Sequence, residues 1–315
     1  MGEVVRVPPE VRVALGQRTV LLRPDETRVH PRFLHYLLLG PQIQDRLHQR
    51  ASGSTVPHLN VADVRNLPLP PVPPKATQSW IAELLGALDD KIESNGRVAA
   101  LAEELLTTHG EAIGSTAMVP LEALVLCDWE MIEPRRCGSD VIDHYSIPAF
   151  DAGRVADRCR AETVMSGKFV LKEPSILVSR LNPRVPRIWY AVPADRPALC
   201  STEFLVMRPR PALSLGDIWL ACSDPYFFAE MAQRATGTSG SHQRVRPQDA
   251  LSIEVLNPRQ VDPAIRAEAD LLIRLSHQRR QESRALAELR DTLLPELLSG
   301  RLRVPEAEEL VESVT

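Results

Sequence analysis

The chain repeats its own sequence at an offset of 184 in the numbering. At this shift Pro41 aligns with Pro225, and Gln49-Arg50-Ala51 aligns with Gln233-Arg234-Ala235. Further identities follow at the same offset and pair Gly53, His58, Val61, Leu67 and Ile81 with Gly237, His242, Val245, Leu251 and Ile265. One position further out, Val20–Pro24 aligns with Leu205–Pro209. A register this constant predicts that the chain contains two copies of one structural plan.

Each copy ends in a proline signal followed by a long amphipathic helix. Five prolines between positions 68 and 74 predict a stiff extended connector, and apolar residues then recur at steps of three and four from Ile81 to Leu105. In the second copy Pro263 opens a similar run that we expect Gly300 to end. Helices of about 35 residues would be roughly 50 Å long. Their matched apolar stripes favour an antiparallel coiled coil, and the alternative is that each helix packs only on its own domain.

The region between the two helices has the pattern of an α+β domain. Short apolar runs at 175–179 and 204–207 predict strands, and the stretch 215–235 has a helical pattern. The second copy contains a segment, 120–185, that has no counterpart in the first copy. We therefore expect an α+β protein with a C-terminal remnant of a first domain at 1–75, a central helix at 76–114, a complete second domain at 115–260, a second long helix at 261–300 and an acidic tail at 301–315.

The distribution of charge matters more for binding than the net charge of −4. The tail 304–315 carries four glutamates and no lysine or arginine, so the rest of the chain is neutral. The stretch 174–210 holds six arginines against Asp195 and Glu203. This local excess favours nucleic-acid binding, and dispersed, solvated arginines are an equally weighted alternative.

Composition also excludes several classes of protein. No run of about 18 apolar residues exists and the N-terminus lacks the layout of a signal peptide, so we expect a cytoplasmic protein that does not enter a membrane. The five cysteines are scattered without a C-x-x-C spacing, which predicts free thiols and neither a zinc site nor a disulfide framework.

Three segments recur in an order that is typical of one known family. They are QRASGSTVPHLNVADVRNLPLPPVP (49–73), its degenerate echo QRATGTSGSHQRVRPQDALSIEVLNP (233–258) and ALAELRDTLLPELLSGRLRV (285–304). Through them nearly the whole chain resembles the specificity subunit of type I restriction–modification systems. The resemblance implies two target-recognition domains that each read one half of a split site in double-stranded DNA. The long helices would space these domains and bind methyltransferase subunits.

The same resemblance implies a subunit that is not itself an enzyme. Modification and cleavage would belong to the methyltransferase subunits and to a motor and endonuclease subunit, which would bind S-adenosylmethionine, ATP and magnesium, so no cofactor is expected in this chain. The short first domain departs from the family pattern. A mis-called start codon, a decayed gene, a silent recombination cassette and a short subunit that forms a homodimer all stay open, as does a non-functional or regulatory fragment that binds only the methyltransferase.

One short segment resembles a catalytic motif. Asp224-Pro225-Tyr226-Phe227 resembles the Asp-Pro-Pro-Tyr motif of adenine methyltransferases, but it lacks the second proline, and no glycine-rich cofactor loop follows a strand. A helix N-cap with proline at the first helical position explains these residues better. The chain also contains no phosphate-binding Walker loop, which disfavours an autonomous enzyme.

Two segments contain the residue types that contact DNA. The proline-stiffened segment 179–187 presents Arg180, Asn182, Arg184 and Arg187 as candidates for base or backbone contacts. The segment 237–244 offers hydroxyl groups and basic side chains for phosphate contacts, and the first copy contains a counterpart of it. The candidates are Thr238, Ser239, Ser241, His242 and Arg244 in the second copy and Ser54, Thr55 and His58 in the first. Lys168 is a weaker candidate elsewhere in the second copy. A solvated loop and a purely structural turn are the respective alternatives.

Overall fold

The structure is a computed structural model that divides into two compact units. Unit 1 comprises Met1–Ser94 and Ser283–Thr315, and unit 2 comprises Asn95–Glu282. The helices α4 (Lys75–Ala112) and α9 (Pro263–Ser299) contribute residues to both units. The structure describes residues 2–8, 10–17, 19–50, 59–113, 117–237, 243–302 and 306–307.

Unit 2 contains the strands, which form three sheets among the described residues. A four-stranded antiparallel sheet has the order β2-β10-β7-β8, with strands Val125–Cys127, Phe204–Pro209, Ser175–Ser179 and Ile188–Ala191. A five-stranded sheet has the order β3-β6-β9-β4-β5, with strands Met131–Ile132, Lys168–Leu171, Ala198–Cys200, Val141–Tyr145 and Asp157–Arg160. In this second sheet β4 and β9 run parallel. β1 (Met118–Pro120) pairs with β11 (Glu254–Leu256).

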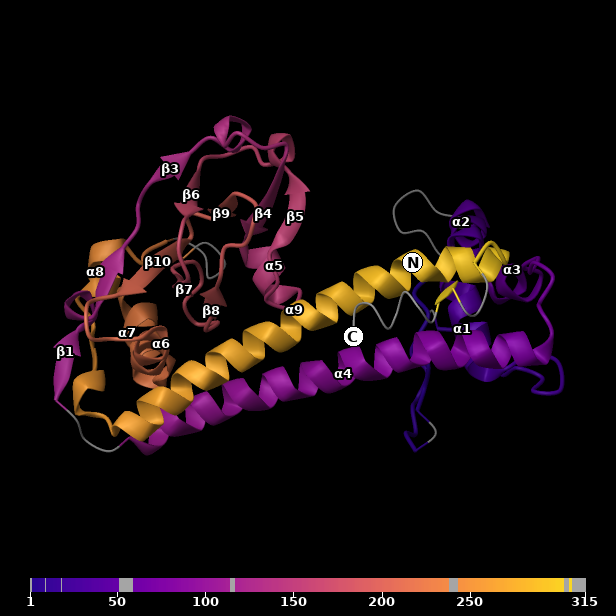
Figure 1. Ribbon diagram of the computed structural model, residues 1–315, viewed down its shortest axis with the longest axis horizontal. Helices are drawn as coiled ribbons and strands as arrows, with labels where there is room; N and C mark the ends of the chain where they lie inside the picture. Colours follow the sequence, from indigo (N-terminus) through magenta and orange to yellow (C-terminus); the bar gives the residue numbers. More distant parts are fainter. Residues whose placement is uncertain are drawn as a thin grey trace. The chain divides into compact units, whose positions relative to one another are not determined.

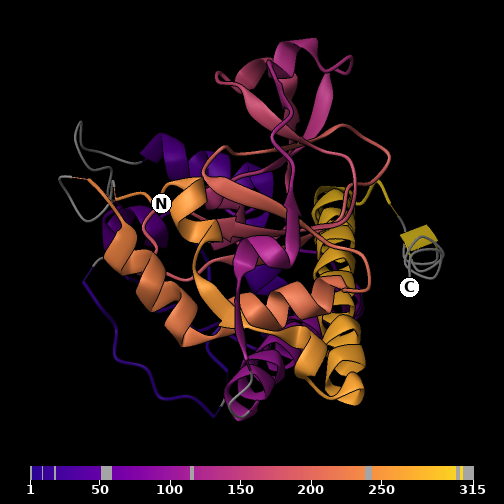
Figure 2. The same ribbon diagram turned by 90° about the vertical axis from the view of Figure 1, so that its left-hand side faces the viewer.

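The four-stranded sheet is covered on both faces, as the two ribbon views show (Figure 1, Figure 2). Leu205 and Met207 of β10 enter the core that the sheet shares with the helices, whereas Phe204 and Val206 enter the core shared with the five-stranded sheet. A strand that is buried on both faces has a continuous apolar sequence, which is why the run 204–207 was recognisable. The predicted strands at 175–179 and 204–207 are both confirmed.

Three of the four short α-helices described in unit 2 begin at side-chain caps, and the N-cap of the last, Arg246, makes no side-chain cap hydrogen bond. The helices are α5 (Ile147–Asp151), α6 (Leu215–Ser223), α7 (Pro225–Arg234) and α8 (Pro247–Leu251), and short 3-10 helices lie at Leu121–Ala123, Pro134–Arg136, Ala161–Thr163 and Pro258–Gln260. Ser214 and Asp217 form a reciprocal capping box at the start of α6. Asp224 accepts a hydrogen bond from the Tyr226 N–H, so the helical stretch predicted at 215–235 is two helices separated at this cap.

In unit 2, α4 and α9 lie side by side and run antiparallel. The Ser276 hydroxyl donates to the Glu103 carboxylate at 2.7 Å, and His109 Nε2 lies 3.3 Å from Glu268 Oε2. Residue numbers therefore rise along α4 as they fall along α9. Leu106 and Ile273 from the two helices join the core beneath the four-stranded sheet. The helices thus pack on each other and on their own domain.

Unit 1 is built from α1 (Pro31–Leu39), α2 (Pro41–Arg50), α3 (Val61–Arg65) and its parts of α4 and α9. Among its described residues, unit 1 has helices and no strand. Its core combines Phe33 and Leu37 of α1 with Leu85 of α4 and Leu293 of α9. The repeated sequence therefore supplies unit 1 with α1, which buries one face against the long-helix pair, and with α2, whose buried residues pack in a second cluster.

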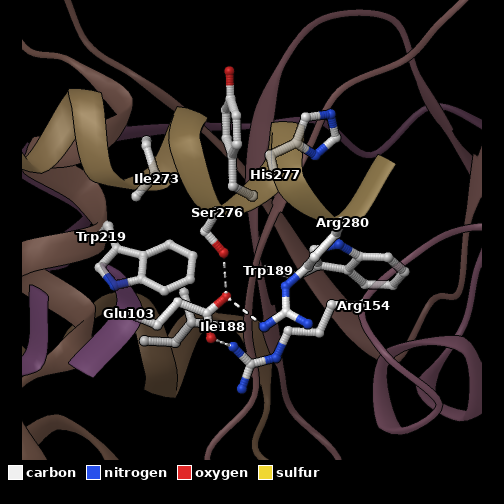
Figure 3. Close-up of a pocket in the computed structure, with 10 residues that line it drawn as sticks. Glu103, Arg154, Ile188, Trp189, Trp219, Ile273, Ser276, His277 and Arg280 are labelled. Atoms are coloured by element: carbon white, nitrogen blue, oxygen red, sulfur yellow. Dashed lines mark hydrogen bonds and ion pairs between the residues drawn. The ribbon is translucent and has the colours of Figure 1, made fainter. Parts of the chain in front are cut away.

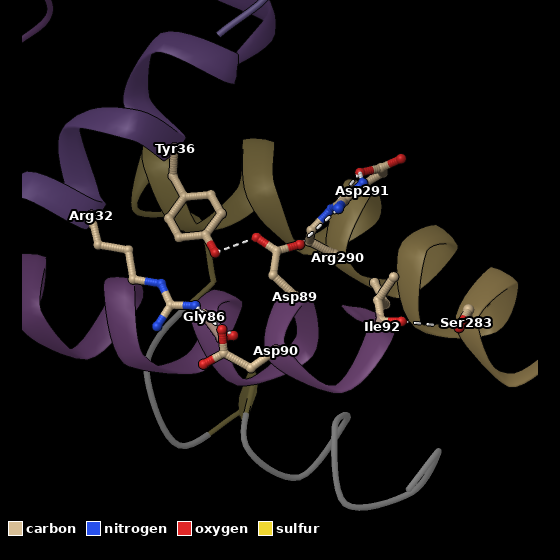
Figure 4. Close-up of polar contacts among 9 residues, drawn as sticks. All are labelled: Arg32, Tyr36, Gly86, Asp89, Asp90, Ile92, Ser283, Arg290 and Asp291. Carbon is tan, nitrogen blue, oxygen red and sulfur yellow. Dashed lines mark hydrogen bonds and ion pairs between the residues drawn. The ribbon is translucent and has the colours of Figure 1, made fainter. Parts of the chain in front are cut away.

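Polar contacts fix the same antiparallel direction in unit 1 (Figure 4). The Tyr36 hydroxyl donates to Asp89 at 2.5 Å, and Arg290 donates to the other oxygen of this carboxylate at 2.8 Å. The Ser283 hydroxyl donates to the Ile92 carbonyl at 3.5 Å. The predicted antiparallel pairing of two long helices is confirmed within each unit, and Gly300, with φ of 72°, ends α9 as predicted.

The repeat is visible element by element. α1 and α6, and likewise α2 and α7, begin and end at residue numbers that differ by 184. Arg50 donates to the Asp63 carbonyl at 3.2 Å in unit 1, and Arg234 donates to the Asp249 carbonyl at 2.9 Å in unit 2. The arginine of the repeated Gln-Arg-Ala therefore holds the end of one helix to the next short helix in each copy. Within the described ranges no helix is apolar and long enough to traverse a bilayer.

Candidate nucleic-acid interface

The first predicted DNA-binding segment of the second copy lies beside Gln243 and Arg244, which belong to the described part of the second predicted segment, in unit 2. The loop between β7 and β8 contains residues 180–187, and the segment 243–246 runs along it. The Asn182 N–H donates to the Gln243 carbonyl at 2.9 Å, and the Val245 N–H donates to the Arg180 carbonyl at 3.1 Å. An isolated bridge pairs Leu181 with Arg244. Two segments that are distant in sequence therefore form one surface, which we call the arginine loop surface (residues 180–187 and 243–246).

Arg180 lies beneath this surface. Its guanidinium donates to the carbonyls of Val245 at 3.1 Å and Thr202 at 2.5 Å. Burial lowers the pKa of Arg180, because a desolvated guanidinium loses hydration that the carbonyls replace only in part. This arginine holds the loop to neighbouring segments, so the geometry gives it a positioning task.

Two other arginines on the surface are engaged with carboxylates. Arg187 forms a two-pronged ion pair with Asp151, with distances of 2.8 and 2.9 Å, and its side chain is 11% exposed. Hydrogen bonding from Arg187 lowers the pKa of Asp151. Arg244 contacts both oxygens of Glu203 at 2.9 and 3.0 Å, and this hydrogen bonding raises the pKa of Arg244. DNA would have to compete with these pairs or use their remaining donors.

Arg184 stands at the tip of the loop. The Val185 N–H donates to the Asn182 carbonyl at 3.0 Å, which closes a four-residue turn with Pro183 at its second position. Asn182 has φ of 48°, a left-handed conformation that asparagine tolerates. Arg184 is exposed, and its side chain makes no hydrogen bond or ion pair with the described part of the chain. Arg246 is likewise exposed at the start of α8. These two side chains have donors available for a ligand.

Lys168 lies outside the arginine loop surface, on β6 of the five-stranded sheet. It is 7% exposed, and its ammonium donates to the Ser166 carbonyl at 2.8 Å and hydroxyl at 2.6 Å. Burial lowers the pKa of Lys168. The remaining predicted contacts lie outside the described residues and stay predictions: Ser54, Thr55, His58, Thr238, Ser239, Ser241 and His242.

The acidic partners were not among the sequence candidates. Glu203 lies immediately before β10, and its position inside an arginine-rich segment was a weak signal for an ion pair. Asp151 gave no signal, because it lies far from Arg187 in sequence. Only the tertiary packing of α5 against the loop brings Asp151 and Arg187 together.

The methyltransferase-like string has a structural task. Asp224 caps α7 with Pro225 at the first helical position, as predicted, and Phe227 is fully buried in the core. A buried ring of this kind cannot stack on a flipped base. Within the described ranges, no group of three or more histidine, cysteine or acidic side chains is arranged to hold a metal ion.

Comparisons with known proteins confirm the predicted resemblance. Residues 5–103 match the family model described as type I restriction modification DNA specificity domain. No curated protein matches the chain significantly. The crystal structure of the type I restriction–modification S subunit from M. genitalium has a similar fold, with a TM-score of 0.54, 17% identity, and coverage of 87% of this chain and 74% of that chain.

A second similar structure is the HsdS subunit from Thermoanaerobacter tengcongensis. It has a TM-score of 0.34, 18% identity, and coverage of 89% of this chain and 73% of that chain.

Proposed function

We propose that this chain, whose residues 5–103 match a type I restriction modification DNA specificity domain, recognises a DNA sequence and acts as a scaffold for partner subunits. It would direct methyltransferase and endonuclease subunits of a type I complex to a site of two half-sites. The single observation that carries the proposal is the arginine loop surface: two separate segments with donors of the kind that read DNA meet on a fold similar to that of an S subunit.

The local positive charge of this surface supports DNA binding, although the whole chain has a negative net charge. Five arginines lie on residues 180–187 and 243–246, and Asp151 and Glu203 are their acidic partners. The surface therefore keeps an excess of positive charge in a chain with a net charge of −4. Such a local excess attracts the phosphate backbone, whereas the exposed Arg184 can reach a base edge.

The paired helices supply the scaffold in this proposal. α4 and α9 would space the recognition elements and bind methyltransferase subunits, while a motor and endonuclease subunit joins the assembled complex. We expect no catalytic step in this chain, since the partners would bind S-adenosylmethionine, ATP and magnesium. Unit 1 has no strand among its described residues, so two copies of the chain in one complex would supply two complete recognition domains.

Competition binding with the assembled complex tests the recognition surface. Arg184→Ala should lower the affinity for the specific site about ten-fold, equivalent to about 1.4 kcal/mol, since one forked donor would lose its base. Ser241→Ala should instead weaken binding to specific and random DNA alike, because a phosphate contact carries no sequence information. The readout is the ratio of specific to random-DNA affinity at one stated salt concentration.

Arg259→Ala provides the matched control, because Arg259 is an exposed arginine of the same unit on the short helix Pro258–Gln260. Its affinity ratio should equal that of the wild-type complex. Equal affinity of the Arg184→Ala and wild-type complexes for the specific site would reject the assignment of Arg184.

A further inference from the structure

A carboxylate at the centre of unit 2 joins the long helices to the recognition domain. Glu103 of α4 accepts hydrogen bonds from Ser276 at 2.7 Å and from Arg280 at 3.0 Å, both on α9. It also forms an ion pair with Arg154, which lies in the turn after α5 (Figure 3). Its side chain is mostly buried. One carboxylate therefore joins α4 to two other elements at once.

The turn that carries Arg154 is held at two points. Arg154 itself has φ of 60°, and its N–H donates to the Phe150 carbonyl at 3.0 Å. Its guanidinium lies 4.7 Å from the centre of the Phe150 ring, which belongs to the core between the two sheets. Arg280 donates to the Gly153 carbonyl at 3.1 Å. The helix α9 thus holds the turn through its backbone, and Glu103 holds it through a side chain.

The charges make Glu103 hard to replace. Burial, together with the nearby Arg280, lowers the pKa of Arg154 to about 10, and burial also lowers the pKa of Arg280. Both guanidiniums stay protonated at neutral pH, and Glu103 is the acidic residue that lines the small cavity beside them. This cavity of about 10 Å³ is hardly large enough for one water molecule. Without the Glu103 charge, two largely buried cations would face each other uncompensated.

The turn connects directly to the arginine loop surface. Asp151, the last residue of α5, holds Arg187 of the loop by the two-pronged ion pair described above. Just beyond it in the chain, Arg154 binds Glu103. Two ion pairs, joined by the backbone of residues 151–154, therefore link α4 to the loop that carries Arg184.

We propose that Glu103 is a positioning residue that fixes the pose of the arginine loop surface relative to the paired helices of unit 2. This inference rests on the proposed function and deepens it. The helices would set the spacing between half-sites, so the rigidity of this link determines how strictly the complex accepts one spacing. Each base pair advances about 3.4 Å along DNA, hence a loop that shifts by a few ångströms relative to the helices can tolerate a neighbouring spacing.

The test uses the near-isosteric variant Glu103→Gln in the full chain. Glu104→Gln is the control, because Glu104 is an exposed neighbour on the same helix. Amide hydrogen exchange of the purified chain should become at least ten-fold faster at positions 150–154 and 180–187 in Glu103→Gln and stay unchanged in Glu104→Gln. In the assembled complex, methylation should keep the same half-site bases while the preference for the native spacing over spacings one base pair longer or shorter falls about ten-fold.

A second variant separates the link from general unfolding. Asp151→Asn removes the negative charge that pairs with Arg187 and leaves Glu103, Arg154 and Arg280 unchanged. It should speed exchange at positions 180–187 and leave positions 150–154 as in the wild-type chain. Wild-type exchange in both segments of Glu103→Gln would overturn the inference, as would an unchanged spacing preference in a complex that methylates. A wild-type complex that directs no methylation would reject the proposed function, and the exchange result would then decide the link alone.

Discussion

Glycine at position 216 allows helix α6 to approach helix α9 closely. A Cβ atom there would lie 2.6 Å from the Asp270 backbone nitrogen, and the Gly216 N–H donates to the Asp270 carboxylate at 2.8 Å. The repeat places Arg32 and Gly86 at the matching positions of unit 1, where the Arg32 guanidinium covers Gly86 and donates to its carbonyl at 2.9 Å. Each copy therefore pairs one glycine with one larger residue. The glycine lies on the short helix α6 in unit 2 and on the long helix α4 in unit 1.

We predict opposite effects for two glycine substitutions in unit 2. Gly216→Ala should lower the free energy of unfolding by about 1–3 kcal/mol, because the contact is with backbone and cannot relax cheaply. Gly96→Ala, in the interior of α4 with no atom within 4 Å of its Cβ position, should raise it by about 0.5–1 kcal/mol. Urea denaturation measures both. A Gly216→Ala chain as stable as the wild type would contradict the close approach of the two helices.

The arginines of the loop between β7 and β8 have side-chain surroundings that the sequence alone does not reveal. The proline-stiffened segment identified a loop correctly, but the arginine side chains on it have different surroundings. Arg184 is exposed, whereas Arg187 is bound to Asp151 and Arg180 to backbone carbonyls. Their partners are scattered far along the chain, so no local pattern can separate a free arginine from a bound one.

At the scale of elements, the two copies stabilise the same helix contact with different chemistry. In unit 2 Arg266 of α9 binds the fully buried Asp217 of α6 at 2.6 and 2.7 Å. Hydrogen bonding to Asp217 raises the pKa of Arg266. The matching positions of unit 1 are Phe33 and Ala82, which both lie in its apolar core. An ion pair and an apolar pair therefore occupy equivalent places in the repeat.

Arg266→Met should be strongly destabilising. The substitution leaves the Asp217 carboxylate buried without its guanidinium, which costs about 3 kcal/mol or more in the free energy of unfolding. Arg279→Met is the control, since Arg279 pairs with Glu282 at a partly exposed site and should change stability by less than about 1 kcal/mol. Thermal and urea unfolding of both variants measure the difference. Equal losses would contradict the special role of the buried pair.

Long elements were predictable and short ones were not. Both long helices follow from apolar residues at steps of three and four, and β7 and β10 follow from apolar runs that are buried on both faces. A strand as short as β3 carries too little sequence to reveal a period. The parallel pairing of β4 with β9 joins segments that are distant in sequence, so only the folded core decides it.

At the scale of the whole molecule, the repeat gives two units with the same helical plan and different additions. Both contain two consecutive short helices, the first of which packs against the long helices, and unit 2 adds the sheets that carry the arginine loop surface. The constant offset between the two copies made the shared plan predictable. The choice of bases stays beyond sequence reasoning, because it depends on the pose of loops whose partners are scattered along the chain.

Methylation mapping by single-molecule sequencing tests the central claim most directly. A methylation-free host would express the cognate methyltransferase subunit with this chain, without it, or with the Arg184→Ala chain. We predict a split methylated motif that appears only with the chain and weakens with Arg184→Ala, and a palindromic motif would indicate two copies per complex. Co-purification of chain and methyltransferase without any new methylated motif would contradict the claim that this chain recognises DNA.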